Sequence, residues 1–126
     1  MGRARDFRQV YEEGVKYVGR LFVLYLYPGD DFARAVVASR KVGNAVCRNR
    51  AKRLLREAFR QRIAARDDLV RDLGMRHWPD RPQPTSLWVV MVARVRILEA
   101  GCAEVIAELD RMLEHPATEE PSGPRP

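Results

Sequence analysis

The spacing of hydrophobic residues changes several times within residues 6–39. A helical spacing within 6–14 predicts a first helix that ends at Gly14. Two runs rich in aromatic and branched residues, 21–27 and 33–39, follow it as strand-like segments. The turn-forming stretch from Pro28 separates them. The two runs are therefore expected to pair as an antiparallel hairpin.

A second helix is predicted from Asn44, a good N-cap residue, to about Arg66. At 100° per residue its apolar and basic positions fall on opposite sides, so one face packs and the other is cationic. The apolar arc comprises Cys47, Ala51, Leu54, Leu55 and Ala58, and the basic side comprises Arg48, Lys52, Arg53, Arg56 and Arg60.

The rest of the chain predicts one strand and one helix. Residues 67–86 mix charges with Gly and Pro and are expected to form a long surface connection with at most one turn of helix. The apolar run 87–93 predicts a strand buried on both faces, and 98–113 carries a helical stripe. We expect one domain, 1–115, followed by a disordered Pro-rich tail, 116–126. The order α-β-β-α-β-α implies an α+β fold, a two-layer sandwich of one sheet and its helices.

Charge is distributed unevenly over the 126 residues. Residues 1–66 carry 16 Lys and Arg against 6 acids, whereas 67–126 carry 7 against 11. Of the 23 basic residues 20 are Arg, whose planar guanidinium suits phosphate and stacks on bases, so a nucleic acid is the favoured partner. No apolar run approaches the length of a membrane span and no signal-peptide core is present, which predicts a soluble, cytoplasmic protein.

Residues that could catalyse hydrolysis are few. Cys47 and Cys102 stand far apart without metal-ligand spacing and are expected to be buried thiols, while His77 and His115 are expected to be solvated surface residues. No nucleophile motif, no paired carboxylates at helical spacing and no phosphate-cradling Gly loop occur. The sequence therefore predicts no catalytic residue and no metal site in the protein.

The segment 40–66 holds 10 basic residues and a single acid, Glu57. Like charges at i, i+4 destabilise a helix, and nothing within this helix compensates them. A phosphate-binding face is the favoured interpretation, and an ordinary solvated face is the alternative. A membrane-surface helix is disfavoured, because large apolar residues beyond Leu54 and Leu55 are lacking.

The 21 residues 40–60, RKVGNAVCRNRAKRLLREAFR, closely resemble the signature of bacterial ribonuclease P proteins, which includes an RNR motif. The segments 6–14, 22–25 and 89–94 also resemble that family's first helix, first strand and the strand that ends in an Ala-Arg pair. The resemblance thus covers about 6–113.

The resemblance implies a fold like the second domain of a small-subunit ribosomal protein, with a left-handed βαβ crossover. It also implies two RNA-binding surfaces, one on the Arg-rich helix for the catalytic RNA and one cleft for the 5′ leader of precursor tRNA. The first would comprise Arg48, Asn49, Arg50, Lys52, Arg53, Arg56 and Arg60. The second would comprise Phe7, Tyr11 and Tyr25, with Ser39, Arg40 and Lys41 at its edge. Core packing is the alternative for the three aromatic residues.

The function implied by the resemblance is that of the protein subunit of the ribonuclease P endoribonuclease, a hydrolase that removes the 5′ leader during tRNA maturation. The RNA subunit would carry the chemistry, Mg²⁺ would be held by RNA and substrate, and the protein would bind the RNA 1:1. A structural or ribosomal RNA-binding protein and a free-standing nuclease are the two alternatives. Ala35, where the family commonly has Gly, the short basic lead 1–5 and the length of 67–86 depart from the family pattern.

Overall fold

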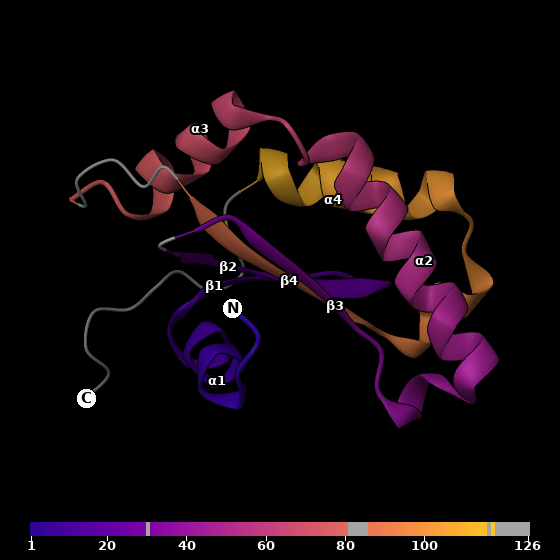
Figure 1. Cartoon of the computed structure of the whole chain (residues 1–126). Helices are drawn as coiled ribbons and strands as arrows, with labels where there is room; N and C mark the ends of the chain where they lie inside the picture. The colour runs from indigo at the N-terminus through magenta and orange to yellow at the C-terminus, as the bar shows by residue number, and fades with distance from the viewer. Residues whose placement is uncertain (30, 81–85, 116, 118–126) are drawn as a thin grey trace.

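A computed structural model describes residues 1–29, 31–80, 86–115 and 117. A four-stranded sheet separates one helix from the other helices, so that α1 covers one face and α2, α3 and α4 lie over the other (Figure 1). The expected α+β sandwich is confirmed. The elements are α1 Ala4–Glu13, β1 Val15–Val18, β2 Phe22–Pro28, β3 Ala33–Val37, the 3₁₀ helix η1 Arg40–Val42, α2 Ala45–Arg62, α3 Asp67–His77, β4 Leu87–Ala93, the 3₁₀ helix η2 Val95–Glu99 and α4 Cys102–Glu114.

The strand order is β1-β2-β4-β3, which corrects the predicted hairpin of β2 and β3. β2 pairs antiparallel with β1 and with β4, and β3 pairs parallel with β4 at the sheet edge. The short strand β1, absent from the prediction, takes the hairpin position beside β2. β4 is mostly buried, although Trp88 and Val92 are only half-buried, and such an apolar strand gains most from a central place.

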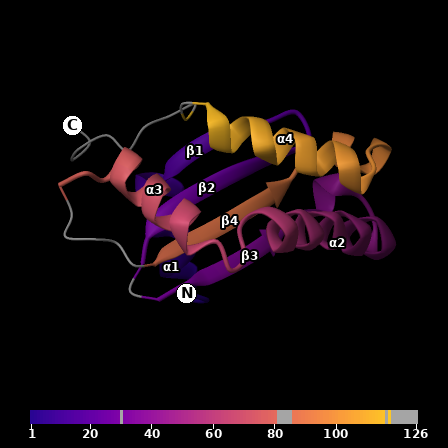
Figure 2. The ribbon, with the colours of Figure 1, turned by 90° about the horizontal axis from the view of Figure 1, so that it is seen from above.

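The connection from β3 to β4 passes through α2 and α3 on one face of the sheet. When Figure 2 is turned so that β3 and β4 point upward, α2 lies nearest to the viewer and β4 lies to the left of β3. The crossover is therefore left-handed, the rarer hand for parallel strands and the hand that the family resemblance implies.

The main core lies between the sheet and the helices α2, α3 and α4. Alternation along the strands sends Leu24 and Met91 to this face, where Leu55 of α2 and Leu109 of α4 meet them. Each of these side chains is fully buried, which contributes about 1.5–3 kcal/mol per residue to the free energy of unfolding. The apolar arc of α2 is thus a packing face, as predicted, with Ala51, Leu55 and Ala58 buried.

The segment expected to be a surface connection contains the eleven-residue helix α3, which corrects the prediction. Leu69, Val70 and Leu73 supply an apolar stripe that the many neighbouring charges obscured in the sequence. His77, expected at the surface, is buried at the end of α3, and its Nε2 lies 2.8 Å from the hydroxyl of Tyr17. A buried imidazole requires such a partner. Residues 81–85 lie outside the described chain.

Smaller differences concern helix ends and cysteines. α2 ends at Arg62 rather than near Arg66, because Ala65 adopts a left-handed conformation with φ of 59°. The last helix begins at Cys102, preceded by η2 instead of extending back to residue 98. Both cysteines are free and half-buried, not fully buried as expected. His115 is exposed, as predicted, and the predicted tail, apart from residue 117, lies outside the described residues.

Candidate RNA interface

Helix α2 begins where the sequence predicted, because Asn44 caps it. The Asn44 side chain accepts a hydrogen bond from the backbone N–H of Cys47 at 2.9 Å, which satisfies one of the otherwise unpaired donors of the first turn. The helix then packs through Ala51, Leu55 and Ala58, so its basic side faces away from the core. Eighteen residues at 1.5 Å rise give a helix roughly 27 Å long, of which the stretch from Arg48 to Arg56 spans about 12 Å.

The predicted RNA-binding residues of α2 divide into two groups. Arg50 donates from Nη2 to the carbonyl of Ala100 at 3.2 Å and so holds α2 against the segment before α4. Arg60 is paired with Glu57 one turn earlier. The remaining basic residues, Arg48, Lys52, Arg53 and Arg56, have no ion pair or side-chain hydrogen bond within the described chain. These four residues, with Asn49 exposed among them, form the cationic face of α2.

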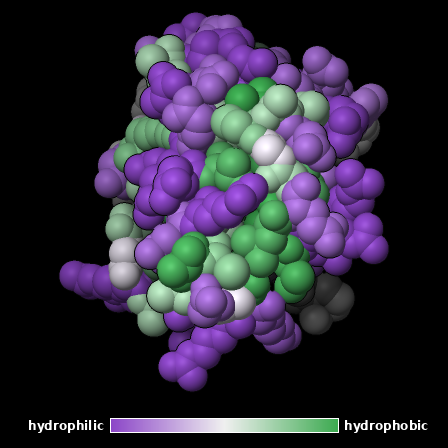
Figure 3. Space-filling model, turned by 90° about the vertical axis from the view of Figure 1, so that its right-hand side faces the viewer, coloured by the Kyte–Doolittle hydropathy of each residue, from purple (hydrophilic) through white to green (hydrophobic). Residues whose placement is uncertain are grey.

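The four cations of this face differ in exposure. Arg53 and Arg56 are exposed, whereas Arg48 and Lys52 are half-buried. The Nε atom of Arg48 is buried without an acceptor among the described residues. The side of the molecule that carries the N-terminal part of α2 is hydrophilic around most of its rim, with apolar residues gathered at its centre and lower half (Figure 3). Unpaired guanidinium and ammonium groups on such a surface can neutralise phosphates.

The pair with Glu57 explains why Arg60 is not part of this face. Hydrogen bonds from Arg60 and then from Gln61 lower the pKa of the Glu57 carboxyl to about 2. The same pair raises the pKa of Arg60. Glu57 is therefore ionised at neutral pH and neutralises the nearest Arg side chain.

The second predicted surface lies on the opposite face of the sheet, beside α1. The ring of Tyr11 lies 4.9 Å from the ring of Tyr25 in an edge-to-face arrangement and 6.3 Å from that of Phe7. Burial, and to a lesser extent Tyr25, raises the pKa of the Tyr11 hydroxyl, so it stays neutral at neutral pH. The three aromatic residues expected at the leader cleft are thus brought together by α1 and β2. We call Phe7, Tyr11 and Tyr25 the aromatic cluster.

The strands extend the aromatic cluster into an apolar floor. Tyr25 of β2 pairs with Val90 of β4, and Val90 pairs with Ala35 of β3, so the three residues form one row across the sheet. Val90 is fully buried on this face. The neighbouring row, Val23, Val92 and Val37, is only half-buried, so the floor becomes more accessible toward the carboxyl ends of β3 and β4.

The segment after β3 joins the two surfaces. Ser39 caps η1, because its Oγ accepts a hydrogen bond from the backbone N–H of Lys41 at 3.3 Å. Ser39, Arg40 and Lys41 are exposed between the end of β3 and the start of α2. The structure thus places the three predicted edge residues between the floor and the cationic face.

Sequence reasoning missed one residue beside the aromatic cluster, Lys16 of β1. Its Nζ lies 5.9 Å from the centre of the Tyr25 ring, and the register pairs the two residues directly. Lys16 adds a cation beside the aromatic cluster. The alternation in VKYV, residues 15–18, was the available signal, but four residues were too few to stand out from the turn that follows.

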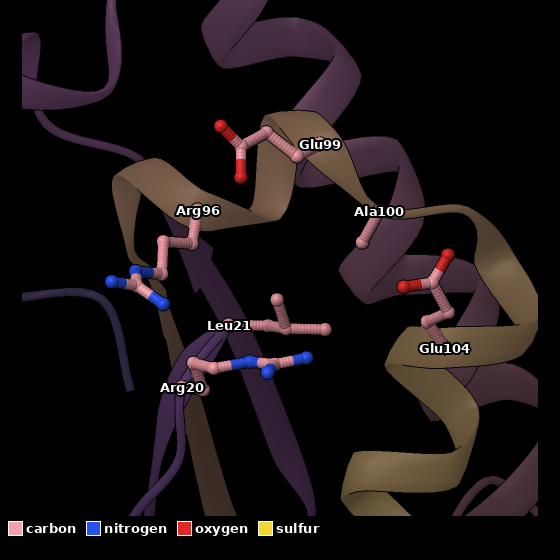
Figure 4. A pocket seen from close by; sticks show the side chains of 6 residues that line it. All are labelled: Arg20, Leu21, Arg96, Glu99, Ala100 and Glu104. Atoms are coloured by element: carbon pink, nitrogen blue, oxygen red, sulfur yellow. The ribbon is translucent and has the colours of Figure 1, made fainter.

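A pocket of about 200 Å³ lies between the β1–β2 turn, η2 and the start of α4. Arg20 and Arg96 face Glu99 and Glu104 around Leu21 in this pocket (Figure 4). Two cations and two anions cancel, so this pocket lacks the positive charge expected of a phosphate site. Within the described residues no group of three or more His, Cys, Asp or Glu could hold a metal ion. None of the described helices is both long enough and apolar enough to span a membrane.

Known proteins with similar sequences share one description. The family model for ribonuclease P matches residues 1–117. A "Ribonuclease P protein component" of Staphylococcus epidermidis is 42% identical over 74 residues, covering 54% of this chain and 64% of that protein. One from Halalkalibacterium halodurans is 45% identical over 62 residues, covering 47% and 52%. The aligned segments thus span about half to two thirds of these relatives.

Solved structures agree with the fold. The RNase P protein of Thermotoga maritima superposes with a TM-score of 0.60 at 26% identity, covering 87% of this chain and 90% of that one. The RNase P protein of Staphylococcus aureus gives 0.63 at 23% identity, covering 90% and 91%, a likeness that concerns the fold alone. Since the family model spans nearly the whole sequence, the chain belongs to the ribonuclease P protein family.

Proposed function

We propose that this chain is the RNA-binding protein subunit of a ribonuclease P endoribonuclease, acting with a catalytic RNA in the cytoplasm to remove the 5′ leader of precursor tRNA. The observation that carries the proposal is the pairing of two different surfaces in one chain of this family. The cationic face of α2 suits a phosphate backbone, and the aromatic cluster on the other side of the sheet suits unpaired bases.

The cationic face is proposed to bind the catalytic RNA in a 1:1 complex. Arg53 and Arg56 are exposed and form no ion pair within the described chain, so they can bind phosphates and release counterions without first breaking one. Arg50 serves a different role, because its guanidinium already fixes the position of α2 through Ala100.

The aromatic cluster and its floor are proposed to bind the single-stranded leader. Bases stack on the faces of Phe7 and Tyr11, and the neutral Tyr11 hydroxyl adds no repulsion toward phosphates. Lys16, Arg40 and Lys41 lie where they can neutralise the leader backbone. Because mature tRNA lacks a leader, these interactions strengthen substrate binding without strengthening product binding.

The hydrolytic step is proposed to belong to the RNA subunit. Mg²⁺ prefers phosphate oxygens and water over all-protein cages, so the catalytic RNA and the substrate would hold it, and it would supply charge stabilisation for hydrolysis. The part of the protein is to neutralise phosphates and hold the leader, so that the metal and the scissile phosphate meet.

The test is cleavage of precursor tRNA by the purified protein with and without the catalytic RNA. We expect leader removal only with both components, and tighter binding of precursor than of mature tRNA. Activity of the protein alone would identify a free-standing nuclease. Assembly with RNA but no preference for the leader would identify a structural RNA-binding protein.

A further inference from the structure

A pocket of about 210 Å³ lies at the junction of α2 and α3, on the face of the sheet opposite the aromatic cluster. It is smaller than the 300–1,000 Å³ typical of small-molecule sites, a size that suits one ring system. The α2–α3 junction passes over the edge of the sheet where β3 begins (Figure 2). The pocket is lined by Phe32, Ile63, Ala65, Arg66, Asp67 and Val70.

Phe32 presents an exposed aromatic ring at this pocket. Its side chain is 45% exposed, and its ring centre lies 5.9 Å from that of the buried Phe59. The guanidinium of Arg34 lies 5.3 Å from the centre of the same Phe59 ring. Phe59 is thus covered by Phe32 and Arg34. Phe32 contacts Phe59 on one side and is open to solvent elsewhere, the arrangement required for stacking on an unpaired base.

The backbone at Ala65 shapes the other side of the pocket. A left-handed φ of 59° at a residue other than Gly is unfavourable and is kept where the surrounding structure requires the turn. Here the turn places Ile63 and Val70 on the pocket wall, so that apolar side chains from both helices line it together with Phe32.

Asp67 supplies an acceptor at this pocket. The adjacent Arg66 directs Nε and Nη2 to the carboxylate of Asp68, at 3.2 and 3.4 Å, and not to Asp67. In the described chain the Asp67 carboxylate has no ion pair. An aromatic face and a carboxylate acceptor at one small pocket, close to the basic α2, match the features that recognise a base through its amino group.

We propose that this pocket binds an unpaired nucleobase that carries an exocyclic amino group, with cytosine preferred over uracil, from the RNA bound along α2. The inference rests on the proposed function only in taking RNA as the partner. The base stacks on Phe32, its amino group donates to Asp67, and Arg34 lies where it can meet a flanking phosphate. Uracil has an oxygen in place of that amino group and would face the carboxylate unfavourably.

The experiment is an NMR titration of the full chain with three pentaribonucleotides: oligocytidine, oligouridine and an abasic pentamer with the same phosphates. The Ile63 and Val70 methyl signals report on the pocket, and signals of Val23 report on the leader cleft. We expect oligocytidine to shift the pocket signals at about one fifth, or less, of the concentration that oligouridine requires. The abasic pentamer should not shift them.

Two variants test the ring of Phe32 and the carboxylate of Asp67 separately, and a third variant is the matched control. Phe32→Leu keeps an apolar side chain but removes the ring, and should weaken the oligocytidine shifts at the pocket roughly 5- to 150-fold. Asp67→Asn should abolish the preference for cytosine. Phe7→Leu, in the leader cleft, should change the Val23 response and leave the pocket response unaltered.

Equal responses to oligocytidine and oligouridine, or pocket shifts with the abasic pentamer, would overturn the proposal. If Phe32→Leu does not fold, the three titrations of the unmodified protein still decide it. A protein that passes this test but does not assemble with the catalytic RNA refutes the proposed function alone. Normal assembly without base-dependent shifts refutes this pocket alone.

Discussion

Glu108 fixes the turn between β1 and β2 to helix α4. Its buried carboxylate accepts three backbone hydrogen bonds, from Arg20 and Leu21 at 2.9 Å and from Phe22 at 3.2 Å. Gly19 permits this approach, because a Cβ there would lie 2.6 Å from the Glu108 Oε2. One acidic side chain thus pairs three donors, of which those of Leu21 and Phe22 would otherwise be buried without acceptors.

We expect Glu108→Gln to lower the free energy of unfolding by about 1–3 kcal/mol, because the amide has one acceptor oxygen and directs an NH₂ group at backbone donors. Urea denaturation measures the change. Glu114→Gln, an exposed position on the same helix, is the control and should have little effect. Equal stability of Glu108→Gln and the wild type would show that the turn does not depend on the carboxylate.

Tyr11 lies at the centre of the aromatic cluster and is 38% exposed. We expect Tyr11→Leu to weaken precursor binding by the holoenzyme roughly 5- to 150-fold and to leave mature tRNA binding unchanged, because the loss of one stacked base costs about 1–3 kcal/mol. Phe7→Leu should act in the same direction. Affinities for both tRNAs, with melting temperatures of the free variants, provide the measurement.

If Tyr11 and Phe7 had only a packing role, a different result would be expected. If the rings served only to stabilise the fold, the variants would melt at lower temperature and bind precursor and mature tRNA more weakly by the same factor. Tyr11 is exposed, Phe7 is half-buried and neither belongs to the main core, which favours an interaction with the leader.

At the scale of elements, local signals were predictable from the sequence and long-range pairing was not. The Asn44 cap and the apolar arc located α2, because both signals lie within the helix itself. The place of β4 between β2 and β3 depends on interactions between distant segments, which no local pattern contains. The candidate site followed the same division, since the resemblance identified Tyr11 and Tyr25, whereas Lys16 needed the pairing of β1 with β2.

The cationic face of α2 gives a prediction for charge reversal. We expect Arg48→Glu, Lys52→Glu and Arg56→Glu together to weaken assembly with the catalytic RNA and to flatten its log–log salt dependence by about 0.9 for each phosphate that the protein no longer neutralises. Circular dichroism should show a folded protein, because none of the three side chains forms an ion pair within the described chain. Arg71→Glu, exposed on α3, is the control. An unchanged slope in the triple variant would contradict the assignment.

A substitution of Glu57, on the same helix, should strengthen RNA binding instead of weakening it. Its pKa of about 2 keeps the carboxylate charged as pH falls to about 4, so the pair with Arg60 persists at ordinary assay pH and is broken only at lower pH. Glu57→Gln removes that charge and releases Arg60. Affinity for the catalytic RNA should therefore rise and its salt dependence steepen, equally at pH 6 and pH 8. A gain seen only at one of these pH values would show that another group is responsible.

At the scale of the whole molecule, the sheet separates the two proposed RNA surfaces. α1 lies on one face and α2 on the other (Figure 1), and the aromatic cluster lies between α1 and β2. No described side chain belongs to both, although η1, with Arg40 and Lys41, joins their edges. The proposed binding of the catalytic RNA and the proposed binding of the leader therefore do not compete for the same face of the sheet.

This separation predicts that defects on the two faces combine independently. Mutations at distant sites with no shared partner usually add within about 0.3–0.5 kcal/mol. The α2 charge-reversal triple should weaken RNA assembly alone, and Tyr11→Leu should weaken leader discrimination alone. Combined in one chain, each should retain its own effect once the RNA concentration is raised to saturate assembly. The measurement is a double-mutant cycle on precursor affinity at saturating catalytic RNA, with Arg71→Glu in place of the triple as control. A coupling energy well above that range would mean that leader and catalytic RNA share a surface, most directly through Arg40 and Lys41 of η1, and that the sheet does not separate their binding.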